Sequence, residues 1–221
     1  MIEKQKMISV STESYTMEQL LQVDKELFGF ADFMHCDVMD GVFVERELFA
    51  LKDLQHYAQN AKMPLDIHLM TENLSQEYKK YIALKPKILT VHYEAFQYEM
   101  ELVLLLNYFK NHGIKAGVSI KPETSIEKIK KILPIADVIL VMSVEIGYGG
   151  QPFMQSALEK VKLLKKLKQE NNHRYLIEVD GGINDTNAKE IFDAGADILV
   201  SGSYISKQAD KASAVLQLKK D

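Results

Sequence analysis

The chain has 221 residues, of which 47% are hydrophobic and 26% are charged, and its formal net charge is −4. This length and composition are typical of a globular protein that buries a sizeable core. The charge balance leaves no basic surplus to neutralise a phosphate backbone, so we expect no nucleic-acid partner. The apolar runs are far shorter than the roughly 20 residues of a membrane-spanning helix, so we expect no membrane partner either.

The single cysteine, Cys36, excludes a disulfide within the chain and is compatible with a reducing compartment. Residues Met1–Lys6 lack the apolar core of a signal peptide. We therefore expect a cytoplasmic protein. The side chain of Cys36 is expected to pack as a small apolar group against a layer of helices.

Short β-rich segments alternate with amphipathic segments along the chain, and no linker or low-complexity tract separates them. In chain order, the predicted strands are Met7–Ser11, Phe33–Val38, Leu65–Leu69, Ile88–His92, Ala116–Ile120, Val138–Ser143, Leu176–Val179 and Ile198–Ser201. The predicted helices, one after each strand, are Met17–Phe28, Ala50–Ala61, Leu74–Leu84, Met100–Asn111, Ser125–Leu133, Ala157–Asn171, Thr186–Ala194 and Ala209–Leu218. Such alternation predicts a parallel sheet joined by helical crossovers. Eight units in this length predict an α/β protein, a single (β/α)8 TIM barrel over residues 1–221, with an open doubly wound sheet as the alternative.

A barrel of this kind carries its chemistry at the C-terminal ends of the strands. Side chains alternate along a strand, and this places the following residues on one face: His35, Asp37 and Met39; Asp66, His68 and Met70; and Asp180. If that face is the barrel interior, two histidines and two aspartates converge at the mouth, a donor set that suits Zn²⁺, Fe²⁺, Co²⁺ or Mn²⁺. The alternatives are core histidines and helix-capping aspartates, but burying such groups unpaired would be costly.

Glycine-rich turns follow three neighbouring predicted strands. They are Gly147-Tyr148-Gly149-Gly150, Gly181-Gly182 and Gly202-Ser203. The loops after the last strands are the common phosphate site of this barrel class. Glycine lets the backbone approach an anion closely and present its N–H groups to it. These turns therefore predict a phosphate-binding site beside the histidines and aspartates.

Three methionines, Met39, Met70 and Met142, lie at or near the same strand ends. One interpretation is ordinary core filling, for which the flexible thioether side chain is well suited. The other is an apolar cap that excludes water from the site and protects a reactive intermediate from side reactions.

Several blocks of sequence resemble the ribulose-phosphate 3-epimerase family, and they occur in order over nearly the whole chain. The blocks are HCDVMDG (35–41), DIHLM (66–70), VHYEA (91–95), MSV (142–144), GYGGQ (147–151), EVDGG (178–182), AGAD (194–197) and SGS (201–203). The fold of that family is a β/α barrel, as predicted here from the alternation of strands and helices.

The resemblance implies that His35, Asp37, His68 and Asp180 bind one divalent metal ion, and that His68 also contacts the substrate. Asp37 and Asp180 would be the acid/base pair, one on each face of the substrate. The implied reaction removes a proton beside a carbonyl, forms an enediolate that the metal stabilises, and returns a proton to the opposite face. A substrate-contacting serine of the family falls on Ser9 or Ser11.

The chain departs from the family pattern near the predicted site. Glu145-Ile146 stand where the family has Asn-Pro, and Lys121 stands where it has an asparagine. We hypothesise that Lys121 and Glu145 form an ion pair at the rim. These departures bear on which substrate is bound and leave the predicted metal and acid/base residues unchanged.

The predicted activity is interconversion of D-ribulose 5-phosphate and D-xylulose 5-phosphate. The alternative within the class is 3-epimerisation of allulose 6-phosphate, since the stretch 151–153 is similar to those enzymes. Two alternatives lie outside it: a non-catalytic phosphosugar-binding barrel, and a synthase barrel of amino-acid or thiamin biosynthesis. The expected partner is a small sugar phosphate, and the amphipathic outer helices allow a homo-oligomer.

Overall fold

The computed structural model of the chain describes residues 6–72 and 74–220, without the side chains of residues 74–77. Residues 1–5, on which the expectation of no signal peptide depends, lie outside this range. Within the described ranges, no helix is both long and apolar enough to cross a membrane.

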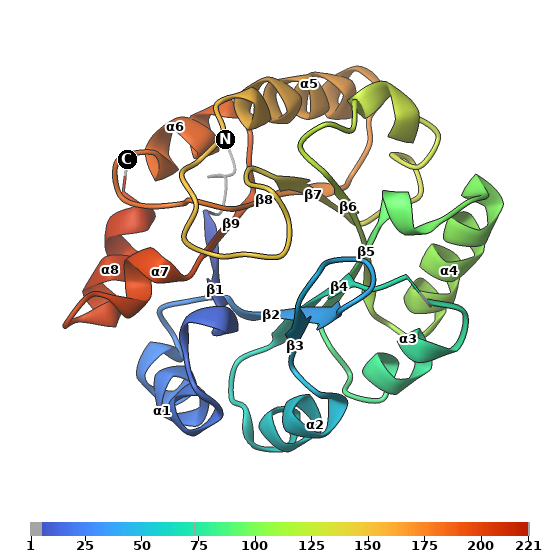
Figure 1. Cartoon of the computed structure of the whole chain (residues 1–221). Helices are drawn as coiled ribbons and strands as arrows, with labels where there is room; N and C mark the ends of the chain where they lie inside the picture. The colour runs from blue at the N-terminus through green and yellow to red at the C-terminus, as the bar shows by residue number, and fades with distance from the viewer. Residues whose placement is uncertain (1–5, 73, 221) are drawn as a thin grey trace.

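Eight parallel strands close into a barrel, seen along its axis in Figure 1. They are β1 (Met7–Ser11), β2 (Phe33–Asp40), β4 (Leu65–Met70), β5 (Ile88–His92), β6 (Lys115–Ile120), β7 (Val138–Met142), β8 (Leu176–Asp180) and β9 (Ile198–Ser201). Each strand pairs with the next one around the ring, and β1 closes it by pairing with both β2 and β9. The closure confirms the predicted (β/α)8 barrel and excludes the open sheet.

The helices surround the barrel (Figure 1). They are α1 (Met17–Leu27), α2 (Leu51–Asn60), α3 (Leu74–Ile82), α4 (Glu99–Asn111), α5 (Ser156–Glu170), α6 (Ala188–Ala194), α7 (Ser203–Ser206) and α8 (Lys211–Leu218). Of these, the sequence did not predict α7. The main apolar core lies between the barrel and the helices, and it includes Cys36, whose side chain is fully buried there as predicted.

Three further short elements follow the ends of strands. They are the 3-10 turn η1 (Thr12–Ser14), the strand β3 (Glu47–Leu48) and the 3-10 turn η2 (Tyr93–Ala95). Strand β3 pairs antiparallel with the end of β2, so the chain between them forms a hairpin at the mouth of the barrel. None of the three was predicted, because each is too short to show a periodic pattern.

The helix predicted over Ser125–Leu133 is wrong. The structure has the 3-10 helix η3 (Ile126–Ile129) followed by turns. Backbone N–H groups bond to the residue three positions back, as from Ile132 to Ile129 at 2.8 Å. The buried isoleucines recur every three residues, and side chains with this spacing align on one face of a 3-10 helix.

The interior of the barrel changes from apolar to polar along its axis. A layer at the N-terminal ends of the strands is formed by Phe33, Ile88, Val138 and Ile198. Toward the C-terminal ends, many interior side chains are polar and buried: Ser9, His35, Asp37, Asp66, His68, Thr90, His92, Ser119 and Glu178. The alternation of side chains thus directs the predicted site residues inward.

Replacing Gly117 by Ala should destabilise the barrel, because the interior has no room for a methyl group there. The added Cβ would lie 2.1 Å from Oγ1, 2.9 Å from Cβ and 3.1 Å from Cα of Thr90, so rotation of the threonine cannot relieve the contact. We expect the free energy of unfolding to fall by about 1–3 kcal/mol or more, measured by urea denaturation. In a Thr90→Gly background the added cost should largely disappear. An equal cost in both backgrounds would refute this explanation.

Candidate active site

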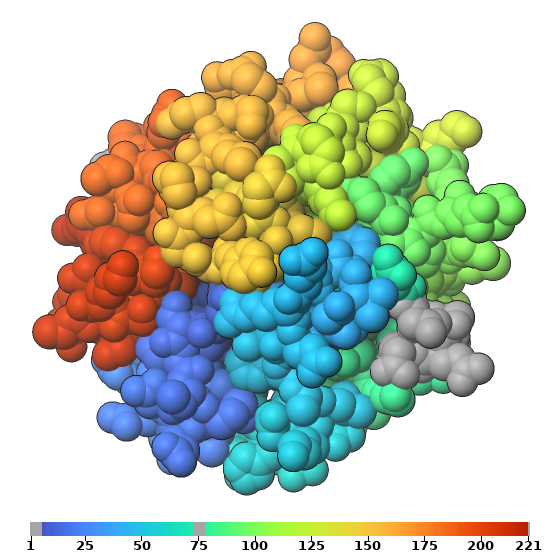
Figure 2. Space-filling view, viewed as in Figure 1, coloured from blue at the N-terminus to red at the C-terminus, as the bar shows by residue number. Residues whose placement is uncertain are grey.

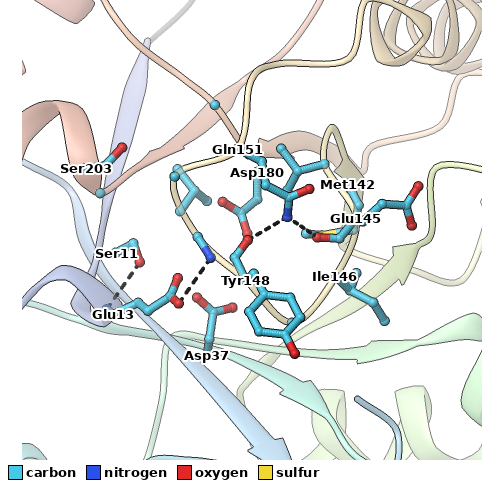
Figure 3. Close-up of a pocket in the computed structure, with 18 of the residues that line it drawn as sticks. Ser11, Glu13, Asp37, Met142, Glu145, Ile146, Tyr148, Gln151, Asp180 and Ser203 are labelled. Carbon is cyan, nitrogen blue, oxygen red and sulfur yellow. Dashed lines mark hydrogen bonds between the residues drawn. The ribbon is translucent and has the colours of Figure 1, made fainter. Parts of the chain in front are cut away.

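A pocket opens at the C-terminal ends of the strands. In Figure 2, the loops that follow β2 and β7 meet over the centre of the barrel. The predicted site residues among those that line the pocket are Ser11, Asp37, Met39, Met70, Met142, Gly147, Tyr148, Gly149, Gly150, Asp180, Gly181, Gly182, Gly202 and Ser203. Figure 3 shows Asp37 and Asp180 in this pocket, with Ser11 and Glu13 on one side and Glu145 and Ile146 on the other.

The four residues of the predicted metal site lie together. Nε2 of His35 is 3.3 Å from Oδ1 of Asp37 and 3.9 Å from Oδ2 of Asp180. Nδ1 of His68 is 3.0 Å from the same oxygen of Asp37. One nitrogen or oxygen atom from each of the four side chains lies within 4.8 Å of all the others. Strands β2, β4 and β8 therefore bring these groups to one point.

These residues fit a divalent cation. Metal–ligand bonds to nitrogen and oxygen are about 2.0–2.2 Å long, so two ligands of one ion lie at most about 4.4 Å apart. A slight contraction of the cluster would satisfy this limit. Nε2 of His35 is buried and makes no hydrogen bond, although it faces two carboxylates. A cation can serve as the partner of such a nitrogen, and two imidazoles with two carboxylates suit a transition metal.

The other ring nitrogen of His35 is held by a carboxylate. Nδ1 lies 2.7 Å from Oδ2 of Asp66, and the Ser9 hydroxyl donates to that oxygen at 2.9 Å. Ser9 is therefore buried beneath the cluster. Ser11 lines the pocket instead, and its hydroxyl oxygen accepts a hydrogen bond from the backbone N–H of Glu13. Of the two serines considered from the sequence, Ser11 is the one placed to meet a ligand.

The two aspartates of the cluster differ in proton affinity. Burial by itself would raise the pKa of Asp37, but the charge of His35 and a hydrogen bond from His68 lower it well below its ordinary value. Burial and the nearby charge of Asp37 raise the pKa of Asp180 to about 7. Two carboxyl groups whose environments separate their pKa values can act as base and acid in one site.

The turn after β7 presents its backbone to the pocket. Gly147 and Gly150 have φ values of +104° and +75°, which a residue with a side chain rarely adopts. The N–H of Gly149 donates to the carboxylate of Glu13 at 3.2 Å, and Arg46 pairs with the same carboxylate. A backbone N–H of this turn is thus already bonded to an anionic group.

The turn after β8 packs closely against the loop that follows β7. Gly182 has φ of +66°, and a Cβ atom there would lie 2.4 Å from the backbone nitrogen of Phe153. Only glycine fits this position, which keeps the two loops together. Gly202 and Ser203, at the start of α7, line the pocket beside them. The structure thus brings the three predicted glycine turns to one pocket.

The three methionines predicted as an apolar cap also lie together at the pocket. Met39, Met70 and Met142 are 6%, 2% and 3% exposed. Ile146 packs against the apolar clusters that contain them. The isoleucine that departs from the family pattern therefore extends the apolar wall around the aspartates.

The hypothesised ion pair between Lys121 and Glu145 is wrong. The ammonium group of Lys121 lies over the ring of Phe43, 4.5 Å from its centroid. Glu145 is exposed, and the salt bridges between described residues include none that joins the two side chains. The β2–β3 hairpin, which the sequence did not predict, supplies the aromatic ring that takes up the lysine.

Several residues of the site were not assigned a role from the sequence. His92 and Glu94 belong to a block that resembles the family, and Asp66 shares a face with His68. Glu13 and Arg46 meet only because two loops fold over the mouth. Strand alternation could have identified His92, since it points inward like His68. No local pattern could have identified the pairing of Glu13 with Arg46.

The fold and the cluster together define a class, a TIM barrel in which histidines and carboxylates gather at the C-terminal ends of the strands. A family comparison gives the particular family. The profile of the ribulose-phosphate 3 epimerase family matches residues 7–206. The chain therefore belongs to this family and is an isomerase of the epimerase type that acts on carbohydrates.

Individual relatives of similar sequence carry the name of the same family. The ribulose-phosphate 3-epimerase of Helicobacter pylori strain 26695 is 41% identical over 84% of this chain and 84% of its own length. The enzyme of Aquifex aeolicus is 37% identical over 90% of this chain and 88% of its own length. The enzyme of Bacillus subtilis is 35% identical over 86% of this chain and 87% of its own length.

Solved structures with much lower identity share the fold. A mutant tryptophan synthase α-subunit from Pyrococcus furiosus has a TM-score of 0.68 at 15% identity, covering 97% of each chain. A 3-hexulose-6-phosphate synthase has a TM-score of 0.66 at 17% identity, covering 96% of this chain and 97% of its own. This similarity extends to the barrel alone, so it gives no support to the synthase alternative.

Proposed function

We propose that this enzyme interconverts D-ribulose 5-phosphate and D-xylulose 5-phosphate, with one divalent ion held by His35, Asp37, His68 and Asp180. The observation that carries the proposal is the convergence of these four side chains at one point of the pocket. Relatives that are 35–41% identical over most of their length and are named ribulose-phosphate 3-epimerase support the choice of substrate.

The two aspartates perform the proton transfers. A divalent ion bound by the cluster would supply positive charge beside the substrate oxygens on which negative charge develops. In one direction the carboxylate of Asp37 removes the C3 proton. The electron pair moves toward the C2 carbonyl and gives an enediolate. Asp180 then returns a proton to the opposite face of C3. The reverse reaction exchanges the two roles.

The glycine turns position the phosphate group. Residues 147–150, 181–182 and 202–203 line the pocket. Their backbone N–H groups can donate to phosphate oxygens, apart from that of Gly149, which donates to Glu13. Ser11 and Tyr148, which line the pocket, contact the remainder of the sugar. His68 is fully buried, so its role is to hold the ion rather than to contact the sugar. Met39, Met70 and Met142 exclude water from the enediolate, which limits its loss to side reactions.

The resemblance of 151–153 to allulose-6-phosphate epimerases has a local explanation. The side-chain amide of Gln151 donates to the backbone carbonyls of Glu145 and Tyr148, each at 2.7 Å (Figure 3). Gln151 thus stabilises the turn after β7, and this role does not depend on the length of the sugar.

The proposal is tested by turnover of purified, metal-loaded protein on D-ribulose 5-phosphate and on D-allulose 6-phosphate, followed with coupled assays for each product. We expect kcat/KM to be much higher for the pentulose phosphate. A preference for the hexulose phosphate would transfer the proposal to that substrate. Folded, metal-loaded protein that turns over neither one would reject it.

A further inference from the structure

His68 faces the metal cluster with one ring nitrogen and a second histidine with the other. Nδ1 lies 3.0 Å from Oδ1 of Asp37, whereas Nε2 lies 2.9 Å from Nε2 of His92. Two ring nitrogens at this distance share one proton, because one must donate and the other accept. If Nδ1 of His68 is to offer its lone pair to a cation, the proton must lie on Nε2 and point at His92.

His92 is fully buried at the end of β5 and makes a second contact through its other nitrogen. Nδ1 lies 3.1 Å from Oε2 of Glu94. A carboxylate only accepts hydrogen bonds, so it requires a proton on Nδ1 of His92. The Nε2 atom of His92 is then an acceptor. This is the arrangement that holds the proton of His68 on its Nε2.

Glu94 is itself fixed in orientation by the start of the loop after β6. Its Oε1 accepts hydrogen bonds from the backbone N–H of Lys121, at 2.9 Å, and from the Thr124 hydroxyl. On the other side, the ring of Phe43 packs on His92 with 4.9 Å between the centroids. The chain of contacts from Thr124 to His68 therefore has little freedom to reorient.

We propose that His92 and Glu94 are positioning residues that fix the tautomer of His68, so that its Nδ1 lone pair faces the cation site. The inference rests on the metal site under the proposed function. The two histidine ligands are then oriented differently. Asp66 contacts His35 directly and leaves Nε2 for the ion, whereas Glu94 acts on His68 through His92 and leaves Nδ1.

Glu94→Gln tests the proposal because it has the same shape and reverses the pattern of protons. The single amide oxygen must accept from the N–H of Lys121, so the NH₂ group faces Nδ1 of His92. His92 then carries its proton on Nε2, His68 must accept there, and the proton of His68 moves to Nδ1, where the ion would bind. We expect the affinity for Co²⁺, measured by calorimetric titration, to fall about 10- to 100-fold.

Glu123→Gln is the matched control, since Glu123 is exposed in the same loop and the charge change is identical. Its affinity for Co²⁺ should equal that of the wild type. If Glu94→Gln does not fold, two variants of His92 test the same proposal. His92→Leu should lose affinity, whereas His92→Gln should retain most of it, because an amide can accept from His68 and donate to Glu94. Equal affinity in all these variants would overturn the proposal.

The tautomers can also be read without metal, from ¹⁵N chemical shifts of the histidine rings. We expect the proton of His92 on Nδ1, facing Glu94, in the wild type and on Nε2, facing His68, in Glu94→Gln. An unchanged tautomer would overturn the proposal even if the affinity falls. If the wild type does not bind Co²⁺ but the tautomers change as expected, the metal site fails and the role of Glu94 stands.

Discussion

Asp37→Asn and Asp180→Asn are each expected to lower kcat for the pentulose phosphate by about 10²- to 10⁴-fold, the usual contribution of a general acid or base. The amide keeps the shape of the side chain and cannot accept a proton from carbon. Because epimerisation needs one carboxylate on each face, the loss of either one should stop inversion. The measurement is steady-state turnover, with the metal content of each variant determined in parallel.

Exchange of the C3 proton with deuterium from D₂O distinguishes the loss of an acid or base from the loss of a metal ligand. A variant that keeps one aspartate can still remove and return the proton on that face, so it should exchange deuterium into one epimer without inverting it. The two variants should label opposite epimers. Asp185→Asn, an exposed change in the loop after β8, should behave as wild type. Inversion at a normal rate by either site variant would refute the two-face mechanism.

Removal of the metal should abolish turnover and lower the melting temperature. A ligand present at about 1,000 times its Kd stabilises the native state by about 4 kcal/mol. For a domain of this size, that corresponds to about 8–16 °C. The loss arises because the apoprotein keeps His35 and the carboxylates of Asp37 and Asp180 close together without the ion that would neutralise them. Chelation followed by calorimetry, then reconstitution with Zn²⁺, Mn²⁺, Fe²⁺ or Co²⁺, would measure both effects.

His35→Ala provides the control, since a site without this ligand should bind metal weakly and respond little to the chelator. Turnover that persists in protein shown to be metal-free would exclude the metal-dependent mechanism. It would leave the acid/base pair, which the Asn variants test separately.

The barrel and most of its elements could be predicted from the sequence, because their causes are local. The period of two in the strands and of about 3.6 in the helices is visible in any short window. Strands β1, β5 and β9 begin and end at the predicted residues. The failure at Ser125–Leu133 arose where a spacing of three fits a 3-10 helix better than an α-helix. The hairpin of β2 with β3 was missed because two residues show no period.

The sequence by itself also determined which faces of the strands carry the site, because alternation puts His35 and Asp37, and His68 and Met70, on one side. Only the tertiary structure decided what each group contacts. The choice between Ser9 and Ser11, the packing of Lys121 on Phe43, and the contact of His68 with His92 all join residues far apart in the chain. Such contacts depend on how strands and loops are staggered around the closed barrel, and no local pattern of residues encodes that geometry.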